Sequence, residues 1–194
     1  MIKRVKNWKA VTISKTRVST YNVLLDNDYL LSELGNIIDL PKKLAASVAK
    51  EWRRNEDIEE IKKKFYTKFC FGVFDHTTPL RLKVFQTILE YADCDLVCYL
   101  AENPIDLVKR QKKRFATYID WADEFLGIKL ITGTGIKHVK QNSQNEAKIK
   151  RYLDKLNDFE LTIVYELTKL TGSFFIATAV YAGVVKAKDA WNAS

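Results

Sequence analysis

The chain has 194 residues, of which 47% are hydrophobic and 29% charged. This length and composition fit one large or two small folded domains and exclude a predominantly disordered protein. Its 32 Lys and Arg against 24 Asp and Glu give a net charge of +8. That charge favours an anionic partner, either nucleic acid or an acidic protein surface, although the need for solubility also accounts for it.

The N-terminal end and the cysteines indicate the compartment. Residues 1–6 are basic, but no apolar segment follows them, so we expect no signal peptide and little room for a transit peptide. Three cysteines, Cys70, Cys94 and Cys98, form an odd and sparse set that argues against a secreted disulfide scaffold. The sequence therefore favours the bacterial cytoplasm, or the mitochondrial matrix if the chain is eukaryotic.

Residues 8–40 are expected to form a small β-meander. Residues 9–14 alternate between apolar and polar side chains, and residues 18–25 are rich in β-branched and aromatic ones. The cluster Asp26-Asn27-Asp28 predicts a turn, after which residues 29–31 return as a further strand.

A helix is predicted to begin at Pro41, with Asp39 or Leu40 near its cap position. Its apolar residues follow the spacing i, i+1, i+4, i+5, i+8, which gives one face that packs on one side of the meander. Residues 55–64 are charged throughout, as in a linker or an exposed helical turn. The predicted apolar face consists of Leu44, Ala45, Val48, Ala49 and Trp52.

From residue 79 onward the spacing is mainly helical. Residues 128–132 are expected to be a short strand or an extended loop, and the apolar residues 174–185 fall short of the ~20 of a membrane span, which favours a core helix. The change of period predicts an α+β fold: a small N-terminal β-meander with one packed helix (residues 1–64), then a mainly helical domain (residues 65–194). The predicted helices lie near 80–101, 104–126, 143–156, 157–171 and 173–191.

The most informative stretch is residues 91–99, Tyr-Ala-Asp-Cys-Asp-Leu-Val-Cys-Tyr. A helical period places Tyr91, Asp95 and Cys98 on one face, and Cys94 shares a side with Cys98. Two carboxylates, two thiols and two tyrosines within nine residues are open to three interpretations. The segment is a metal site, an acid/base pair, or a semi-buried helix that docks onto something.

Metal binding is the weakest of the three interpretations. Structural zinc usually takes four Cys or His ligands, with cysteine pairs at CxxC-like spacing. Here Cys94 and Cys98 form a CxxxC pair, and His76 and His138 lie far away in the sequence. We therefore expect two semi-buried helix cysteines and no metal.

Catalysis has little support. Asp93 and Asp95 are two residues apart, so on a helix they point to different sides and form no carboxylate pair. The G-x-S-x-G motif is absent, and Ser173 is typical of a helix cap. A small hydrolase built on Cys70 or His76 stays an alternative that requires a pocket joining them. We expect no catalytic residue and no cofactor.

Residues 109–114, Lys-Arg-Gln-Lys-Lys-Arg, form a basic run on one predicted helix. It suits phosphate contacts, or equally a face that is solvated or turned to an acidic protein. Neither an aromatic RNA-binding motif nor a zinc finger accompanies it, and Gly133-Thr134-Gly135 lacks the third glycine of a phosphate loop. The protein-facing interpretation is favoured, and a basic nucleic-acid-binding module is the alternative, for which binding would fall steeply with salt.

An ordered set of short motifs runs along nearly the whole chain. Each is weak alone, but their colinear order is specific. The set resembles the assembly chaperones that handle the alpha subunit of the ATP synthase F1 sector, the family of the second mitochondrial F1 assembly factor and its bacterial homologues. The motifs are Trp8-Lys9, Val23-Leu24-Leu25-Asp26, Leu40-Pro41, Ala49-Lys50-Glu51-Trp52, Thr67-Lys68 with Asp75, residues 91–99, Pro104, Leu107, Gln111, Trp121, Gly127, Gly135-Ile136, Val139 with Gln141, Gly172-Ser173 and Ala190-Trp191.

The chain departs from the family pattern at several positions. Phe65 stands where the family has Pro, and Phe69-Cys70-Phe71 replaces a small polar run. Phe115 replaces a family Trp, and Leu100 replaces an Arg. Family members continue with an acidic, Trp-containing tail, whereas this chain ends at Ser194, so part of the interface is expected to be missing if that tail contacts the partner.

The resemblance implies a non-enzymatic chaperone. Such a protein binds the free alpha subunit and shields the surface that later faces the beta subunit. The expected partner is therefore the F1 alpha subunit, without cofactor or membrane insertion, and nucleic acid is disfavoured. Trp52 and Trp121 are expected in the core, and Gln141 is expected to satisfy buried backbone groups. The candidate partner-binding residues are Tyr91, Asp93, Asp95, Tyr99, Lys109 and Arg110.

Overall fold

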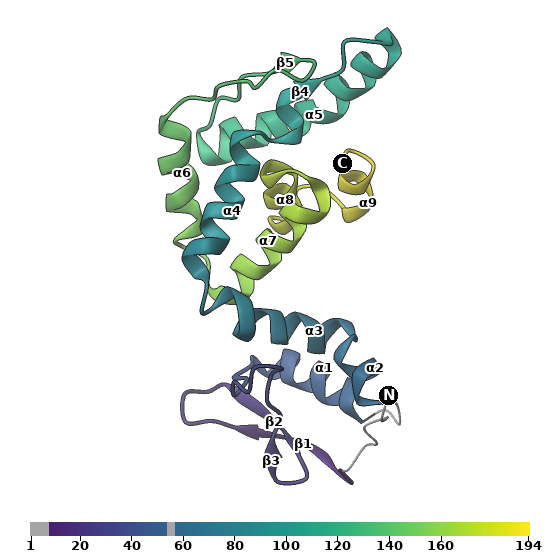
Figure 1. The fold of residues 1–194 in the computed structure, drawn as a ribbon, viewed down its shortest axis with the longest axis vertical. Helices are drawn as coiled ribbons and strands as arrows, with labels where there is room; N and C mark the ends of the chain where they lie inside the picture. The colour runs from purple at the N-terminus through teal and green to yellow at the C-terminus, as the bar shows by residue number, and fades with distance from the viewer. Residues whose placement is uncertain (1–7, 54–56) are drawn as a thin grey trace. The chain divides into compact units, whose positions relative to one another are not determined.

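The structure is a computed structural model that describes residues 8–53 and 57–194. It has the predicted α+β fold and divides into two compact units between Pro79 and Leu80 (Figure 1). The sequence placed this division between residues 64 and 65. The difference concerns residues 65–79, which belong with the first unit for reasons that its hydrogen bonds make clear.

The first unit contains the predicted meander. The strands β1 (Val11–Lys15), β2 (Tyr21–Leu25) and β3 (Asp28–Tyr29) form an antiparallel sheet in the order β1-β2-β3, with Val11 opposite Leu25. Asp26 makes the turn after β2 at φ +56, and its carboxylate accepts hydrogen bonds from the backbone N–H groups of Lys9 and Ala10. Asp and Asn tolerate this left-handed conformation better than most residues, so the turn cluster acts as predicted.

Helix α1 (Lys42–Trp52) follows and packs against β1 and β2 (Figure 1). Its N-cap residue is Pro41, one or two residues later than the predicted cap at Asp39 or Leu40. The predicted apolar face is correct, although Leu44 is only half-buried. The fully buried members of this face are Ala45, Val48, Ala49 and Trp52.

Two short helices and a π-helical segment complete the first unit: α2 (Ile58–Lys62), α3 (Phe65–Gly72) and η1 (Val73–Thr77). Helix α2 supplies a helical turn within residues 55–64, but the turn is exposed only in part because Ile61 is buried. Residues 55 and 56 lie outside the described part of the chain. The buried Glu51 carboxylate accepts the backbone N–H groups of Tyr66 and Thr67, and Trp52 Nε1 donates to Thr67 Oγ1 at 3.0 Å. These bonds hold α3 to α1, which explains why the first unit extends past residue 64.

In the second unit, two predictions of secondary structure are wrong. The helix predicted over 80–101 ends at Asp93, because Cys94 leaves the helical region at φ −121 and ψ 41. The helix predicted over 173–191 is split into two. Of the two alternatives predicted for residues 128–132, the structure has the loop and not the strand. The observed elements are α4 (Arg81–Asp93), η2 (Leu96–Cys98), β4 (Tyr99–Leu100), α5 (Ile105–Leu126), β5 (Gly133–Thr134), α6 (Gln144–Leu153), α7 (Asp158–Thr171), α8 (Phe174–Tyr181) and α9 (Ala187–Trp191).

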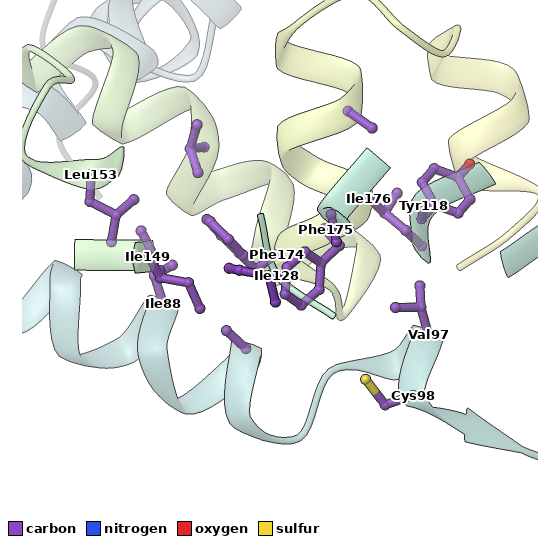
Figure 2. Packing of buried hydrophobic residues seen from close by; sticks show 14 of the residues in the cluster. Ile88, Val97, Cys98, Tyr118, Ile128, Ile149, Leu153, Phe174, Phe175 and Ile176 are labelled. Atoms are coloured by element: carbon purple, nitrogen blue, oxygen red, sulfur yellow. The ribbon is translucent and has the colours of Figure 1, made fainter. Parts of the chain in front are cut away.

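Helix α8 is the centre of the second unit and contacts α4, α5, α7 and α9 (Figure 1). Every residue from Phe174 to Ala179 is buried, as expected for a helix that is apolar on all sides. Figure 2 shows Phe174 and Phe175 among core side chains that include Ile128 and Ile149. The apolar segment 174–185 therefore contains the predicted core helix.

Within the described chain, none of the helices combines the length and the apolar character that crossing a membrane requires.

Candidate functional site

Asp95 lies inside the second unit, not on its surface. The residue is fully buried and is the N-cap of η2, where Oδ1 accepts the N–H of Val97 at 3.1 Å. Oδ2 accepts the N–H groups of Phe174 at 2.7 Å and Phe175 at 3.3 Å. One carboxylate thus caps η2 and the first turn of α8, where the helix dipole favours negative charge.

Two predictions about Asp95 are therefore wrong. It does not share a helix face with Tyr91 and Cys98, because α4 has already ended, and a buried side chain cannot contact a partner. Burial raises the pKa of Asp95 to about 7, against the opposing effect of the Ser173 hydroxyl and the three backbone N–H donors. An Asp two residues before the N–H that it caps is a recognised local signal for a helix start or turn. Here the helical spacing of apolar residues continues past Asp95 and obscured that signal.

The cysteines do not form a reactive or metal-binding cluster. Cys94 is exposed, whereas Cys98 is buried and burial raises its pKa to about 12. In the first unit, burial likewise raises the pKa of Cys70 to about 12, and His76 is exposed. A thiol held protonated is a poor nucleophile, so this geometry gives no support to the hydrolase alternative. Among the described residues, no three Cys, His, Asp or Glu side chains group as a metal site would require.

Two other residues of the 91–99 motif, Asp93 and Tyr99, hold a loop. Asp93 is exposed, and its Oδ2 lies 3.0 Å from His138 Nε2. The Tyr99 hydroxyl accepts the N–H of Val139 at 3.2 Å. Both contacts fasten residues 131–143, which include β5 and lead into α6 and which we call the 131–143 loop, to α4 and β4. Tyr91 is half-buried near the end of α4.

Gln141 satisfies backbone groups, as expected, but within the same loop. Its Oε1 accepts the N–H of Ile131 at 3.1 Å, and its Nε2 donates to the carbonyl of Ile131 at 2.8 Å and of Val139 at 3.3 Å. These bonds close the two ends of the loop onto each other. The Ile131 backbone is exposed here, not buried as predicted.

The two tryptophans singled out by the sequence are structural. Trp52 is buried between α1 and α3, where it bonds to Thr67. Trp121 is half-buried in α5, stacks on Phe125 with 4.2 Å between ring centroids, and donates from Nε1 to Thr178 Oγ1 at 3.3 Å. Trp121 therefore joins α5 to the central helix α8.

The basic run lies on α5 and faces solvent. Lys109 and Arg110 are exposed, as are the other basic residues of the run, whereas Gln111 is half-buried and accepts the N–H of Ala101 at 2.7 Å. The structure thus gives α5 a buried apolar side and an exposed cationic side.

A pocket of about 560 Å³ lies between α4, the 131–143 loop and α6. Three motif residues that the sequence treated separately line it together: Asp93, His138 and Gln141. Sequence reasoning missed this pocket because its lining residues are spread along the sequence from Gln86 to Phe175. Only the tertiary packing brings them together.

Comparison with known proteins identifies the family. The family model described as ATP12 chaperone protein matches residues 5–123, which is more than half of the chain. The chain belongs to the ATP12 chaperone family. Asp95 lies within the matched residues 5–123, whereas the 131–143 loop lies beyond them.

Three solved structures extend the similarity over nearly the whole chain. Atp12 from Paracoccus denitrificans is 26% identical with a TM-score of 0.88, and the alignment covers 96% of this chain and 80% of that one. The D202K mutant of P. denitrificans Atp12p is 27% identical with a TM-score of 0.86, at 94% and 78% coverage. The Atu1473 protein from Agrobacterium tumefaciens is 26% identical with a TM-score of 0.87, at 97% and 71% coverage.

The resemblance expected from the sequence is thereby confirmed. Membership in the ATP12 family supports a role as an ATP synthase assembly chaperone, and a chaperone acts by binding another chain. The functional site to be sought in this molecule is accordingly a binding surface.

Proposed function

We propose that this protein binds the free alpha subunit of the ATP synthase F1 sector and shields its assembly interface from aggregation. The observation that carries the proposal is the ATP12 family match over residues 5–123. An unassembled subunit exposes apolar surface that would be buried in the complex, and such surface is an aggregation liability.

The exposed side of α5 has the mixed character that such a partner requires. Ile105, 67% exposed, lies four residues before Lys109, so both side chains occupy one face of the helix. Arg110 is adjacent and exposed. This side combines an apolar contact with cationic groups, and it complements a partner surface that is apolar and acidic.

The residues proposed to contact the alpha subunit are those of the sequence prediction without the buried Asp95. Lys109 and Arg110 lie on α5, whereas Asp93, Tyr91 and Tyr99 lie at and after the end of α4. Asp93 and Tyr99 also fasten the 131–143 loop, so their substitution alters both the surface and the loop. The α5 pair is therefore the cleaner test of partner binding.

The test is co-expression with the alpha subunit of the same organism, followed by size-exclusion chromatography and a light-scattering assay of alpha-subunit aggregation. The wild type is expected to form a complex and to suppress aggregation. The double variant Lys109→Glu/Arg110→Glu is expected to weaken binding about tenfold or more, because it reverses two cationic contacts. No complex with a competent alpha subunit refutes the proposal.

A matched control separates a specific surface from net charge. The double variant Lys42→Glu/Lys43→Glu makes the same charge change at exposed positions in the first turn of α1, where acidic residues suit the helix dipole. Equal losses in the two double variants would mean that only overall charge matters. A steep fall of binding to a nucleic acid with increasing salt would instead favour the nucleic-acid alternative.

A further inference from the structure

The pocket between α4, the 131–143 loop and α6 is built from both apolar and polar groups. Its apolar lining includes Leu89 from α4, Ile149 from α6 and Phe175 from the central helix α8. Its volume of about 560 Å³ is in the range of small-molecule sites, and it also accommodates one or two amino-acid side chains. The main driving force for binding in this pocket would therefore be the burial of an apolar part of the occupant.

One polar atom at this pocket lacks a hydrogen-bond partner. Asn145 lines the pocket and is only 7% exposed, and its Nδ2 is buried without a partner among the described residues. Buried amide groups are normally paired, because an unmade hydrogen bond costs the full desolvation of the donor. This donor is suited to an acceptor brought by an occupant, such as a carbonyl or carboxylate oxygen.

Three carboxylates and one ammonium group line the pocket, and each carboxylate already has a partner. Glu90 is exposed and accepts a hydrogen bond from Gln86 Nε2 at 3.3 Å. Asp93 already contacts His138, and Glu146 forms a salt bridge with Lys150 at 2.5 Å. Lys140 lines the pocket, is exposed, and has no ionic partner within the described chain. The lining donors that remain available are the Lys140 ammonium group, the Asn142 and Asn145 side-chain amides and the Ser143 hydroxyl group.

We infer that this pocket binds a short extended segment of the client chain, seating an apolar side chain against Leu89, Ile149 and Phe175. A backbone carbonyl of the segment accepts the Asn145 Nδ2 hydrogen bond, and an acidic side chain of the segment meets Lys140. The inference rests on the proposed function for the identity of the client, since that client is the alpha subunit.

Ser143 and Gln144 offer a matched pair of variants. Ser143 lines the pocket and is the N-cap of α6, yet its side chain makes no capping hydrogen bond, so Ser143→Trp fills the pocket at little cost to the helix. Gln144 is exposed and does not line the pocket, so Gln144→Trp adds the same bulk next to it. Asn145→Leu removes the unpaired donor while keeping a similar volume.

The experiment has two arms. The first measures binding of the wild type and variants to the whole alpha subunit, and the second measures binding to a tiled set of fluorescent ten-residue peptides from that subunit by polarisation. The wild type is expected to bind peptides that contain an apolar residue next to an acidic one. Ser143→Trp and Asn145→Leu are expected to weaken this binding about tenfold, and Gln144→Trp to leave it within about twofold.

The thermal stability of the free protein distinguishes a binding role from a folding defect. Replacing an unpaired buried donor by an apolar side chain is neutral or stabilising, so Asn145→Leu is expected to keep or raise the Tm while losing peptide binding. A lowered Tm together with unchanged peptide binding would show that Asn145 has a structural role and would overturn the assignment of its donor.

The outcomes of the two arms separate the two proposals. If the alpha subunit binds equally to the wild type and to Ser143→Trp, and no peptide distinguishes them, the pocket is refuted and the proposed function stands. If the whole alpha subunit does not bind but peptides do, and Ser143→Trp loses them, the pocket stands and the proposed function fails. Peptides that bind Ser143→Trp and Gln144→Trp equally also refute the pocket.

Discussion

Substitution of the buried Asp95 by Asn should change how the stability of the second unit depends on pH. The folded-state pKa is raised to about 7 from the ordinary value of 3.8, so the folded protein holds a proton at pH values where the unfolded chain has lost it. The raised pKa therefore contributes stability that is fully present below pH 3.8 and is lost as the pH rises to about 7. An amide at this position does not titrate, so that contribution is removed.

The magnitude follows from the shift. Between pH 3.8 and 7 each pH unit lowers the free energy of unfolding by about 1.4 kcal/mol, which makes about 3 kcal/mol between pH 5 and pH 8. Asp95→Asn also loses one acceptor, because its oxygen cannot serve Val97 and the two α8 amides together, at a cost of about 1–3 kcal/mol. That cost is independent of pH to first order, so the two effects separate.

The assay is urea denaturation of the wild type and of Asp95→Asn from pH 5 to pH 8, followed by far-UV circular dichroism, with hydrogen exchange of the α8 amides as a local readout. The stability of the wild type relative to Asp95→Asn should fall by about 3 kcal/mol over this range. Asp120→Asn, at an exposed position of α5 in the same unit, controls for the general effect of removing one negative charge. A difference that stays constant or moves in the opposite direction would show that the three N–H donors outweigh burial and keep the carboxylate ionised.

Two further predictions concern hydrogen bonding and backbone strain. Trp52→Phe removes the Nε1 bond to Thr67 and leaves its buried hydroxyl one partner short, so urea denaturation should show a loss of about 1–2 kcal/mol, which a Thr67→Val background should reduce. Gly135→Ala should destabilise by about 1–2 kcal/mol because φ is +73, whereas Glu102 Oε1, 2.7 Å from the new Cβ, is the end of an exposed side chain that can turn away. Gly35→Ala, at φ +85 with no atom within 4 Å, is the control for the backbone effect, and equal Tm losses in the two variants would exclude a contribution from Glu102.

The sequence predicted those elements in which one local signal decides the structure. Helix α1 and the long helix α5 repeat their apolar residues at helical spacing, and the predicted ranges agree closely with the observed ones. The Asp26 turn follows from residue type in the same way. These elements require no contact with a distant part of the chain to be recognised.

The prediction of a continuous helix over residues 91–99 failed because a contact with a distant part of the sequence overrides the local pattern. The helical spacing continues from Tyr91 through Cys98, yet Asp95 caps the amide of Phe174, which lies 79 residues away in the sequence. Helix propensity is worth a few tenths of a kcal/mol per residue, whereas several hydrogen bonds to a buried carboxylate are worth more. The pocket could not be predicted for the same reason, since α4, the 131–143 loop and α6 meet only in the folded unit.

Residues of the 91–99 motif therefore act both in the core and near the surface of the second unit. The buried Asp95 fixes the start of helix α8. Asp93 and Tyr99 fasten the 131–143 loop, which forms one wall of the pocket. The unpaired side-chain amide of Asn145 stands out in this hydrogen-bonded unit, because a buried donor without a partner destabilises the free protein. A buried donor left unpaired in the free protein is expected at a binding site, where the occupant supplies the missing acceptor.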